Sequence, residues 1–259
     1  MGGLTVLAAL RRQLPDEDYV YLGDTARLPY GTKSASTVRR YAAQAASQLV
    51  ERGVKALVVA CNTASAFALA HLREEFAPLP VFGVVQPGAE AAFARAGEDG
   101  VLVLATESTI AAGAYQRALT ELAPRLPVYG RACPLWVTLA EQGPQNPAFI
   151  EHVLRYALRG FLDGRPHTLL LGCTHFPVFE SALQALLPAG TVVVDSAETT
   201  AANVAVELAQ LGLISDLAPG GPGGPGGALF FATDGAARFV QVGGYFLGAA
   251  IESVELIDL

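Results

Sequence analysis

Two cysteines occupy matching places in this sequence of 259 residues. Cys61 lies in ALVVACNTASA (56–66) and Cys173 lies in TLLLGCTHFPV (168–178), so each follows a short apolar run and precedes polar residues. A thiolate acts as a base and a thiol as an acid, and backbone N–H groups at a helix start lower the pKa of a cysteine. Two thiols on opposite sides of a cleft would therefore remove a proton from one face of a carbon and return a proton to the other.

Less reactive roles compete with this interpretation. A single cysteine at a strand end is commonly a small core residue, and this role is expected for Cys133, which precedes a proline. Cys173 and His175 would also suit half of a metal site, but no second Cys/His cluster stands at ligand spacing, so no metal is expected. A third alternative is a thiol hydrolase, which uses a single catalytic cysteine. This function would not explain why the second cysteine segment is present.

The composition is that of a folded protein with one large or two smaller domains. Hydrophobic residues make up 52% and charged residues 16%, with a net charge of −7, which argues against disorder and against a basic surface for nucleic acid. The apolar stretches are too short for a membrane span, and the N-terminal one is too short for a signal sequence. With three cysteines, the chain is expected to be a cytoplasmic protein with free thiols and no nucleic-acid or membrane partner.

Short apolar runs alternate with helical patterns along the chain, which predicts an α/β fold with mostly parallel sheets covered by helices on both faces. The weak repeat around the cysteines predicts two similar three-layer domains, with ligands outside the carboxyl ends of the strands. The Gly/Pro-rich segment 218–227 is predicted to be a surface insertion without a function of its own. The predicted strands cover 19–22, 56–60, 81–85, 101–105, 168–172 and 191–194, with a last short strand in ALFFAT (228–233). The predicted helices cover 36–52, 63–76, 87–96, 108–122, 147–162, 176–187 and 198–211, with a closing helix after ALFFAT.

Five motifs in order resemble the glutamate racemase family of cofactor-independent amino-acid racemases. They are GDTARLPYG (23–31), ACNTASA (60–66), LATESTI (104–110), CPLWVTLAEQG (133–143) and LGCTHFPVF (171–179). Each motif is weak alone, but the five together span the chain from Gly2 to about Ala202. His175 stands where related aspartate racemases usually carry Glu, and the Pro-Tyr-Gly turn is present, so both features favour glutamate.

The resemblance implies interconversion of L- and D-glutamate without a cofactor, which supplies D-glutamate for peptidoglycan. It implies that Cys61 and Cys173 transfer the protons and that His175 and Glu141 assist the second cysteine. The implied substrate contacts are Tyr30, Gly31, Asn62, Thr63, Thr106, Thr109, Thr174 and His175.

The resemblance also implies a homodimer and a discontinuous first domain. The expected division is 1–87 with 200–259 for the first domain and 88–199 for the second, with the active site in the cleft between them. A pyridoxal cofactor would need a lysine for its Schiff base, and the chain has only Lys33 and Lys55. Lys55 begins the strand before Cys61, whereas Lys33 follows the Tyr-Gly turn and is not excluded by the sequence.

The sequence departs from the family pattern at its start and at Gln86. Family members begin with a strand that ends in an Asp-Ser pair before Gly-x-Gly-Gly-Leu-Thr-Val, and here Met1 stands at the x position. We therefore expect this chain to be a truncated form of a longer enzyme, with a groove or looser packing in its first domain. Without the carboxylate of that pair, Cys61 is expected to be a poorer base. Gln86 stands where the family usually has Glu.

Two rival functions share most of these features. One is a racemase or decarboxylase of the same superfamily with another substrate. The other is a non-catalytic binding protein that keeps the fold; the missing Asp-Ser pair favours this rival, and the presence of both cysteines disfavours it.

Overall fold

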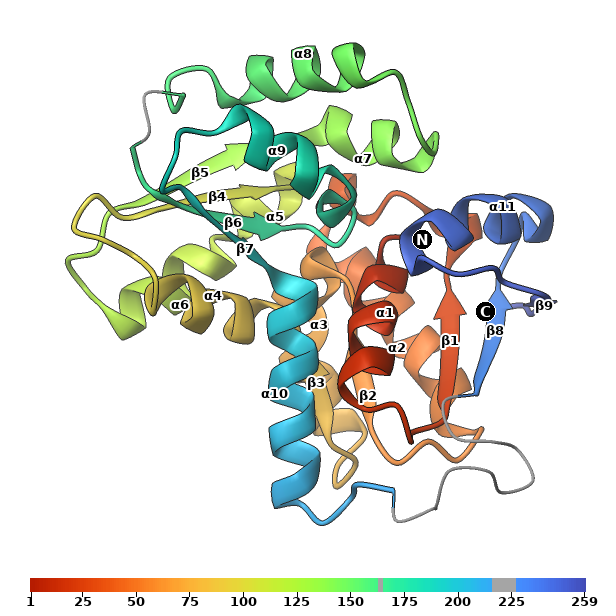
Figure 1. The fold of residues 1–259 in the computed structure, drawn as a ribbon. Coiled ribbons are helices and arrows are strands. Elements are labelled where there is room, and N and C mark those ends of the chain that lie inside the picture. The colour runs from red at the N-terminus through yellow and green to blue at the C-terminus, as the bar shows by residue number, and fades with distance from the viewer. Residues whose placement is uncertain (163–164, 216–226) are drawn as a thin grey trace.

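The computed structural model describes residues 1–162, 165–215 and 227–259. In these residues, helices pack around three sheets whose paired strands are all parallel, as Figure 1 shows. The prediction of an α/β fold with parallel sheets is therefore confirmed. The predicted insertion at 218–227 lies outside the described residues except for Gly227.

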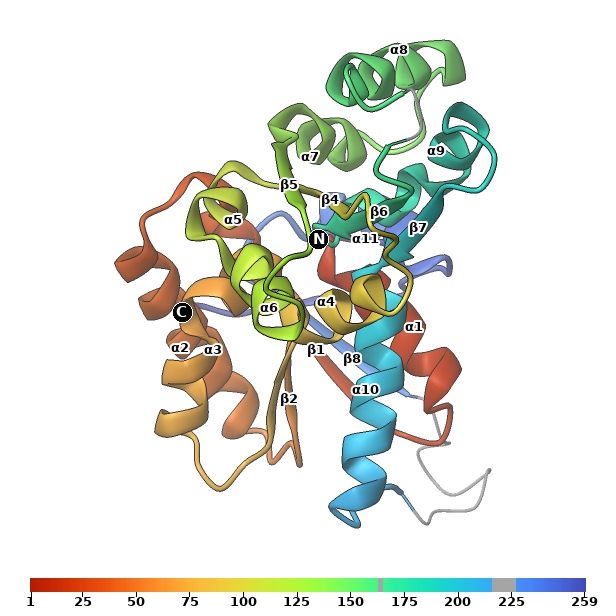
Figure 2. The same cartoon turned by 90° about the vertical axis from the view of Figure 1, so that its left-hand side faces the viewer.

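A four-stranded sheet in the order β5-β4-β6-β7 forms the second part of the molecule. Side chains alternate across it: Leu102 and Leu104 pack into one core cluster, and Val101 and Val103 pack into another on the opposite face. Figure 2 shows helices on both sides of this sheet, which gives three layers. The elements of this second part are α4 (Val85–Phe93), β4 (Val101–Ala105), α5 (Glu107–Ala112), α6 (Ala114–Leu122), β5 (Val128–Ala132), α7 (Pro134–Glu141), α8 (Pro147–Leu158), β6 (Thr168–Gly172), the 3-10 helix η3 (Phe176–Phe179), α9 (Glu180–Leu186) and β7 (Val192–Asp195).

The first part holds two small sheets, ordered β1-β8-β9 and β2-β3. Within the described residues, β1 pairs only with β8 and β2 pairs only with β3. One edge of each of these two strands, β1 and β2, therefore has no strand partner. The elements of this first part are α1 (Gly3–Gln13), β1 (Tyr19–Gly23), the 3-10 helices η1 (Thr25–Arg27) and η2 (Tyr30–Thr32), α2 (Ala35–Val50), β2 (Leu57–Val59), α3 (Asn62–Glu75), β3 (Val81–Gly83), β8 (Ala228–Ala232), α11 (Ala236–Leu247) and β9 (Glu255–Leu256).

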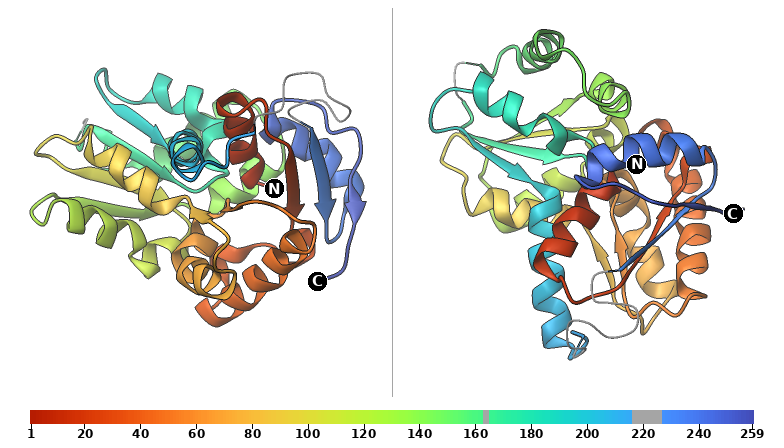
Figure 3. Two further views of the ribbon diagram at one scale, coloured as in Figure 1. Left: turned by 90° about the horizontal axis from the view of Figure 1, so that it is seen from below. Right: turned by 45° about the vertical axis from the view of Figure 1, so that its right-hand side comes forward.

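Helix α10 (Ser196–Gln210) joins the two parts. It follows β7 of the second part and runs beside α1 of the first part, and it also packs against α4. Figure 3 shows the same arrangement from below, and its right-hand view shows the start of the chain beside α11. The domain boundaries expected at 87/88 and 199/200 lie inside α4 and α10, and the division into two domains remains a prediction.

The structure differs from the predicted elements at three places. The single helix expected over 108–122 is two helices, because Gly113 between them adopts a left-handed backbone conformation with φ of 62°. The helix expected over 176–187 begins as the 3-10 helix η3. Helices α1 and α7 and strand β5 were not predicted. The elements expected from the sequence therefore lacked some of those that cover or extend the sheets.

Candidate active site

Both cysteines lie where a strand has just ended. Cys61 follows β2 and is the N-cap residue of α3, in an extended backbone conformation. Cys173 directly follows Gly172, the last residue of β6, and precedes the 3-10 helix η3. Both residues line one cavity of about 380 Å³ that is built from both parts of the molecule. The expectation that the two cysteine segments meet at the carboxyl ends of their strands is therefore met.

The cavity gathers nearly all of the residues that the sequence indicated. Thr109 is the exception, because it is buried behind the wall and reaches the cavity only through Thr63 and Thr106. The predicted residues that line the cavity are Tyr30, Gly31, Cys61, Asn62, Thr63, Thr106, Glu141, Cys173, Thr174 and His175.

His175 lies between Cys173 and Glu141. Its Nδ1 is 3.7 Å from Sγ of Cys173, and its Nε2 is 3.0 Å from Oε1 of Glu141. The ring of Phe246 from α11 meets the His175 ring edge-on, with 5.3 Å between the centroids. The segment is fixed further by Thr5 of α1, whose hydroxyl donates to the carbonyl oxygen of Thr174 at 2.9 Å.

The protonation states of this pair follow from burial and from their mutual hydrogen bond. Burial lowers the pKa of His175, although the hydrogen bond to Glu141 acts in the opposite direction. Burial opposes ionisation of Glu141, yet its hydrogen bond and charge interaction with His175 leave its pKa below the usual value. At neutral pH the pair is therefore a neutral imidazole beside a carboxylate.

The cysteine thiols differ from the expectation. Burial raises the pKa of the Cys61 thiol, although the backbone N–H groups of Ala64 and Thr63 lower it in part. Burial raises the pKa of Cys173 to about 12, with only partial relief from the backbone N–H of His175. The sequence argument counted the helix-start N–H groups and omitted desolvation, which is the larger effect here. Both thiols are protonated at neutral pH in this structure.

Three threonine hydroxyls form a closed ring at one end of the cavity. Oγ1 of Thr63 lies 3.0 Å from Oγ1 of Thr106 and 3.0 Å from Oγ1 of Thr109, and the last two atoms lie 2.9 Å apart. Thr63 belongs to α3 of the first part, whereas Thr106 caps α5 of the second part. The ring therefore connects the two parts of the molecule directly beside the cavity.

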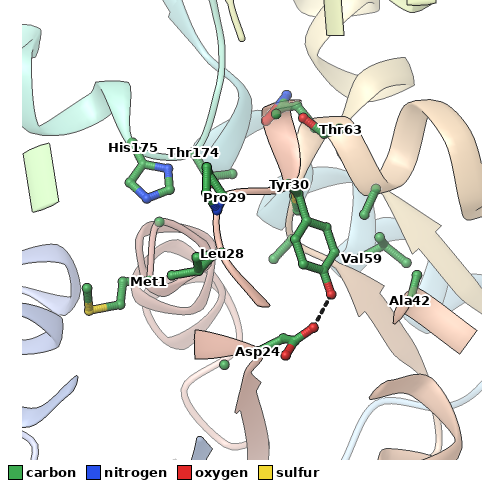
Figure 4. Close-up of a pocket in the computed structure, with 18 of the residues that line it drawn as sticks. Met1, Asp24, Leu28, Pro29, Tyr30, Ala42, Val59, Thr63, Thr174 and His175 are labelled. Carbon is green, nitrogen blue, oxygen red and sulfur yellow. Dashed lines mark hydrogen bonds between the residues drawn. The ribbon is translucent and has the colours of Figure 1, made fainter. Parts of the chain in front are cut away.

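The hydroxyl of Tyr30 is fixed by Asp24, which was not predicted as a site residue. This hydroxyl donates a short hydrogen bond to Asp24, as Figure 4 shows. Asp24 also accepts hydrogen bonds from Nε of Arg27, at 2.9 and 2.7 Å, and from the hydroxyl of Thr233, at 3.1 Å. Asp24 and Arg27 stand in the same GDTARLPYG motif as Tyr30, and this proximity was the available signal.

Beyond Tyr30 the cavity continues between β1 and β2. Its wall there includes Val20 and Leu22 of β1, Leu57 and Val59 of β2, and alanines of α2 such as Ala42. This wall is apolar, and it runs along the two strand edges that have no strand partner in the described residues. We call this part of the cavity the groove between β1 and β2; the truncation expected from the sequence stays a prediction.

Other residues that the sequence singled out lie away from the cavity. Among the described residues, the cavity wall includes neither Lys33 nor Lys55, and Nζ of Lys55 lies 2.5 Å from Oε2 of Glu17. Gln86 is exposed on α4, where its amide donates to Glu90 at 2.8 Å. Cys133 is buried in the core of the second part, as expected.

No group of three or more His, Cys, Asp or Glu side chains in 1–162, 165–215 and 227–259 is arranged to hold a metal ion. In the same ranges, every helix is too short or too polar to cross a bilayer.

Comparison with known proteins identifies the family. The family model described as Asp/Glu/Hydantoin racemase matches residues 4–204. The glutamate racemase of Geobacter metallireducens is 43% identical over 259 residues, which are 100% of this chain and 94% of that protein.

Solved structures agree with this relationship. A glutamate racemase isoform from Bacillus anthracis superposes with a TM-score of 0.91 at 36% identity, covering 100% of this chain and 94% of that one. A glutamate racemase from Francisella tularensis in complex with D-glutamate gives a TM-score of 0.89 at 32% identity, with coverage of 100% and 94%. The resemblance carried by the five motifs is confirmed at the level of the family. The chain belongs to the Asp/Glu/Hydantoin racemase family and is an isomerase.

Proposed function

We propose that this chain interconverts L- and D-glutamate without a cofactor, through proton transfer by Cys61 and Cys173. The observation that carries the proposal is that both thiols line one cavity between the two parts of the molecule, each at the end of a parallel strand. The similarity to glutamate racemases supports glutamate as the substrate. The product D-glutamate would serve peptidoglycan synthesis in the cytoplasm.

The proposed reaction exchanges one proton on each face of the α-carbon. One cysteine, as thiolate, takes the α-proton and becomes a thiol, and the electron pair of the broken C–H bond stays on the carbon. The other cysteine, as thiol, gives its proton to the opposite face and becomes a thiolate. The site thus holds one thiolate and one thiol before and after the reaction, and the two cysteines have exchanged protonation states, which suits them for the reverse direction. The enzyme returns to its starting state when the new thiol loses its proton to solvent and the new thiolate takes one up.

The polar residues of the cavity are assigned to the substrate's charged groups. Asn62, Thr63 and Thr174 hold the amino group and the α-carboxylate, together with the Tyr30–Gly31 turn. Thr106 faces the side-chain carboxylate, and Thr109 supports it from behind through the threonine ring. His175, with Glu141 behind it, is placed to accept the proton of Cys173.

The difficult step is ionisation of a weakly acidic α-carbon without an electron sink. A water-poor site with fixed hydrogen-bond donors favours this step, because charge that develops in the transition state meets dipoles already in place. The same burial keeps both thiols protonated in this structure. One thiol must therefore lose its proton when substrate enters, and His175 is the neighbouring base for Cys173.

Proton exchange at the α-carbon tests the proposal directly. The chain is incubated in D₂O with L-glutamate and separately with D-glutamate, and NMR follows loss of the α-proton while circular dichroism follows loss of optical activity. Cys61→Ser and Cys173→Ser should abolish racemisation, and Cys133→Ser is the matched control that should keep it. A panel of other amino acids, with aspartate first, separates glutamate from other substrates of the superfamily. Full activity in both cysteine variants would refute proton transfer by Cys61 and Cys173, whereas a wild-type chain that exchanges no α-proton would favour the non-catalytic binding role.

We also propose that the groove between β1 and β2 limits the rate of this chain. One edge of each strand lacks a strand partner in the described residues, and Cys61 follows the end of β2 with only Ala60 between them. A strand placed in this groove would pair with both edges and could carry a carboxylate to Cys61. A version extended before Met1 by a β-strand ending in Asp-Ser should racemise glutamate faster, whereas the same extension ending in Ala-Ala should restore packing only. Equal rates for all three versions refute this part of the proposal.

The relationship to the family supports a homodimer as well. Light scattering coupled to gel filtration measures the mass in solution, and a mass near that of a single 27.0 kDa chain at micromolar concentration counts against the dimer.

A further inference from the structure

Tyr115 of α6 reaches the first cysteine segment from inside the protein. The residue is only 1% exposed, and its hydroxyl accepts a hydrogen bond of 2.7 Å from Nδ2 of Asn62. Asn62 directly follows Cys61 and lines the cavity. Tyr115 itself is behind the cavity wall, so it acts on the site through Asn62.

The same side chain lies against the second cysteine segment. A Cβ atom added to Gly172 would lie 2.8 Å from Cε2 of Tyr115, which is too close for a real contact. Gly172 therefore leaves the space that the tyrosine ring occupies, and it is the residue directly before Cys173. On another side, a Cβ on Gly88 of α4 would lie 3.3 Å from the Tyr115 hydroxyl.

One buried side chain thus touches the neighbours of both cysteines, at Asn62 and at Gly172. We propose that Tyr115 is a positioning residue that sets the separation of the two cysteine segments and fixes the orientation of Asn62. This inference rests on the proposed function, because it assigns Asn62 to the substrate.

The hydrogen bond also decides which atom of Asn62 remains for a ligand. With Nδ2 committed to Tyr115, the other atom is Oδ1, which is buried and has no hydrogen-bond partner in the described part of the chain. An amide oxygen only accepts hydrogen bonds. Asn62 therefore presents an acceptor, which suits an ammonium group such as the amino group of an amino acid and not a carboxylate.

Tyr115→Phe removes the hydroxyl and keeps the ring against Gly172. The loss of one buried hydrogen bond predicts a fall of about fivefold in kcat/KM. The fall should be the same for L- and D-glutamate, because the equilibrium constant between the two enantiomers is one. We expect the fall mainly as a rise in KM, because the α-ammonium loses an oriented acceptor. The matched control is Tyr19→Phe: the Tyr19 hydroxyl donates to the carbonyl oxygens of Leu10 and Leu14, at 3.0 and 2.7 Å, and Tyr19 is not part of the described cavity wall.

A double-mutant cycle separates positioning from general stability. If Tyr115 acts through Asn62, the double variant Asn62→Ala/Tyr115→Phe has the same kcat/KM as Asn62→Ala alone. Activity is normalised to the folded fraction from circular dichroism. Additive losses, or equal losses in Tyr115→Phe and Tyr19→Phe, overturn the proposal.

Thiol reactivity gives a readout that does not depend on turnover. Freeing Asn62 loosens the start of α3, so Cys61 should react with iodoacetamide at least threefold faster in Tyr115→Phe and at the wild-type rate in Tyr19→Phe. A wild-type chain that does not exchange the α-proton of glutamate counts against the proposed function only. In that case, unchanged reactivity of Cys61 in Tyr115→Phe still overturns the role of Tyr115, and a faster reaction supports it.

Discussion

Nδ1 of His175 lies 3.7 Å from Sγ of Cys173. The other ring nitrogen lies 3.0 Å from a Glu141 oxygen, and a carboxylate only accepts hydrogen bonds, so Nε2 carries the proton. In the neutral ring, Nδ1 then has a free electron pair that faces the thiol. The geometry gives Cys173 a nearby base of one defined tautomer.

Glu141→Gln should disturb this tautomer, because the glutamine amide can donate to Nε2 and leave the ring proton on Nδ1. We expect kcat to fall about 100-fold, a loss typical of removing general acid–base assistance. Steady-state racemisation of both enantiomers measures the effect. Glu75→Gln is the matched control, since Glu75 pairs with His71 at 3.2 Å on the exposed surface of α3. A rate unchanged in Glu141→Gln would show that the tautomer does not matter.

The Cys173 thiol should become reactive only at high pH. Because its pKa is about 12, its thiolate fraction rises tenfold with each pH unit below that value. We expect the rate of alkylation by iodoacetamide, followed at the Cys173 peptide by mass spectrometry, to climb from pH 7 to pH 10 without levelling. Added glutamate should undergo proton transfer at its α-carbon, and it should also block alkylation of Cys173. A plateau below pH 9 in the empty enzyme contradicts the assignment.

Gly31→Ala should weaken substrate binding without unfolding the protein. A Cβ at this position would lie 2.7 Å from Cβ of Thr106, so the Tyr30–Gly31 turn must move away from the threonine ring. We expect KM to rise about tenfold, equivalent to about 1.4 kcal/mol, with a smaller change in kcat. Gly97→Ala serves as the control, because the nearest atom there is the end of the Asp99 side chain. A KM within twofold of wild type in Gly31→Ala would falsify the contact.

Because of Asp195, the free energy of unfolding should fall as the pH rises. Burial raises its pKa to about 7, whereas the value in an unfolded chain is close to 3.8. Between about pH 4 and pH 7 the folded state therefore holds a proton that the unfolded state has lost, so the free energy of unfolding falls with increasing pH. Asp195→Asn should flatten this part of the curve in urea unfolding. The exposed substitution Asp18→Asn should leave the slope as in wild type, and a wild-type slope in Asp195→Asn would contradict the prediction.

Much of the fold could be predicted from the sequence, because its buried strands are short apolar runs. The runs 101–105 and 168–172 have the same bounds in the structure as β4 and β6. Strand β5 was missed because it lies at the edge of its sheet and reads VYGRA, with Tyr129 and Gly130 exposed. Edge strands lack the continuous apolar run that identifies a central strand.

The candidate site could be predicted where its residues stand beside the cysteines. Asn62, Thr63, Thr174 and His175 all do, and all line the cavity. Tyr115 had no such signal, since its partner Asn62 is 53 residues away and one tyrosine on a helix is typical of a core. The thiol pKa values were also beyond reach, because desolvation depends on packing that no local pattern reports.

The threonine ring has a consequence that follows from counting hydrogens. Each of the three hydroxyl groups has one hydrogen to donate. The three hydrogen bonds among Thr63, Thr106 and Thr109 require all three of these hydrogens. A carboxylate brings only acceptors, so none of these hydroxyls can bind it while the ring stays closed. Binding the side chain of glutamate would turn at least one hydroxyl outward and open the ring, which also breaks a link between α3 and α5. The hydroxyl hydrogens that join α3 to α5 in this structure are thus the same ones that a bound carboxylate would need.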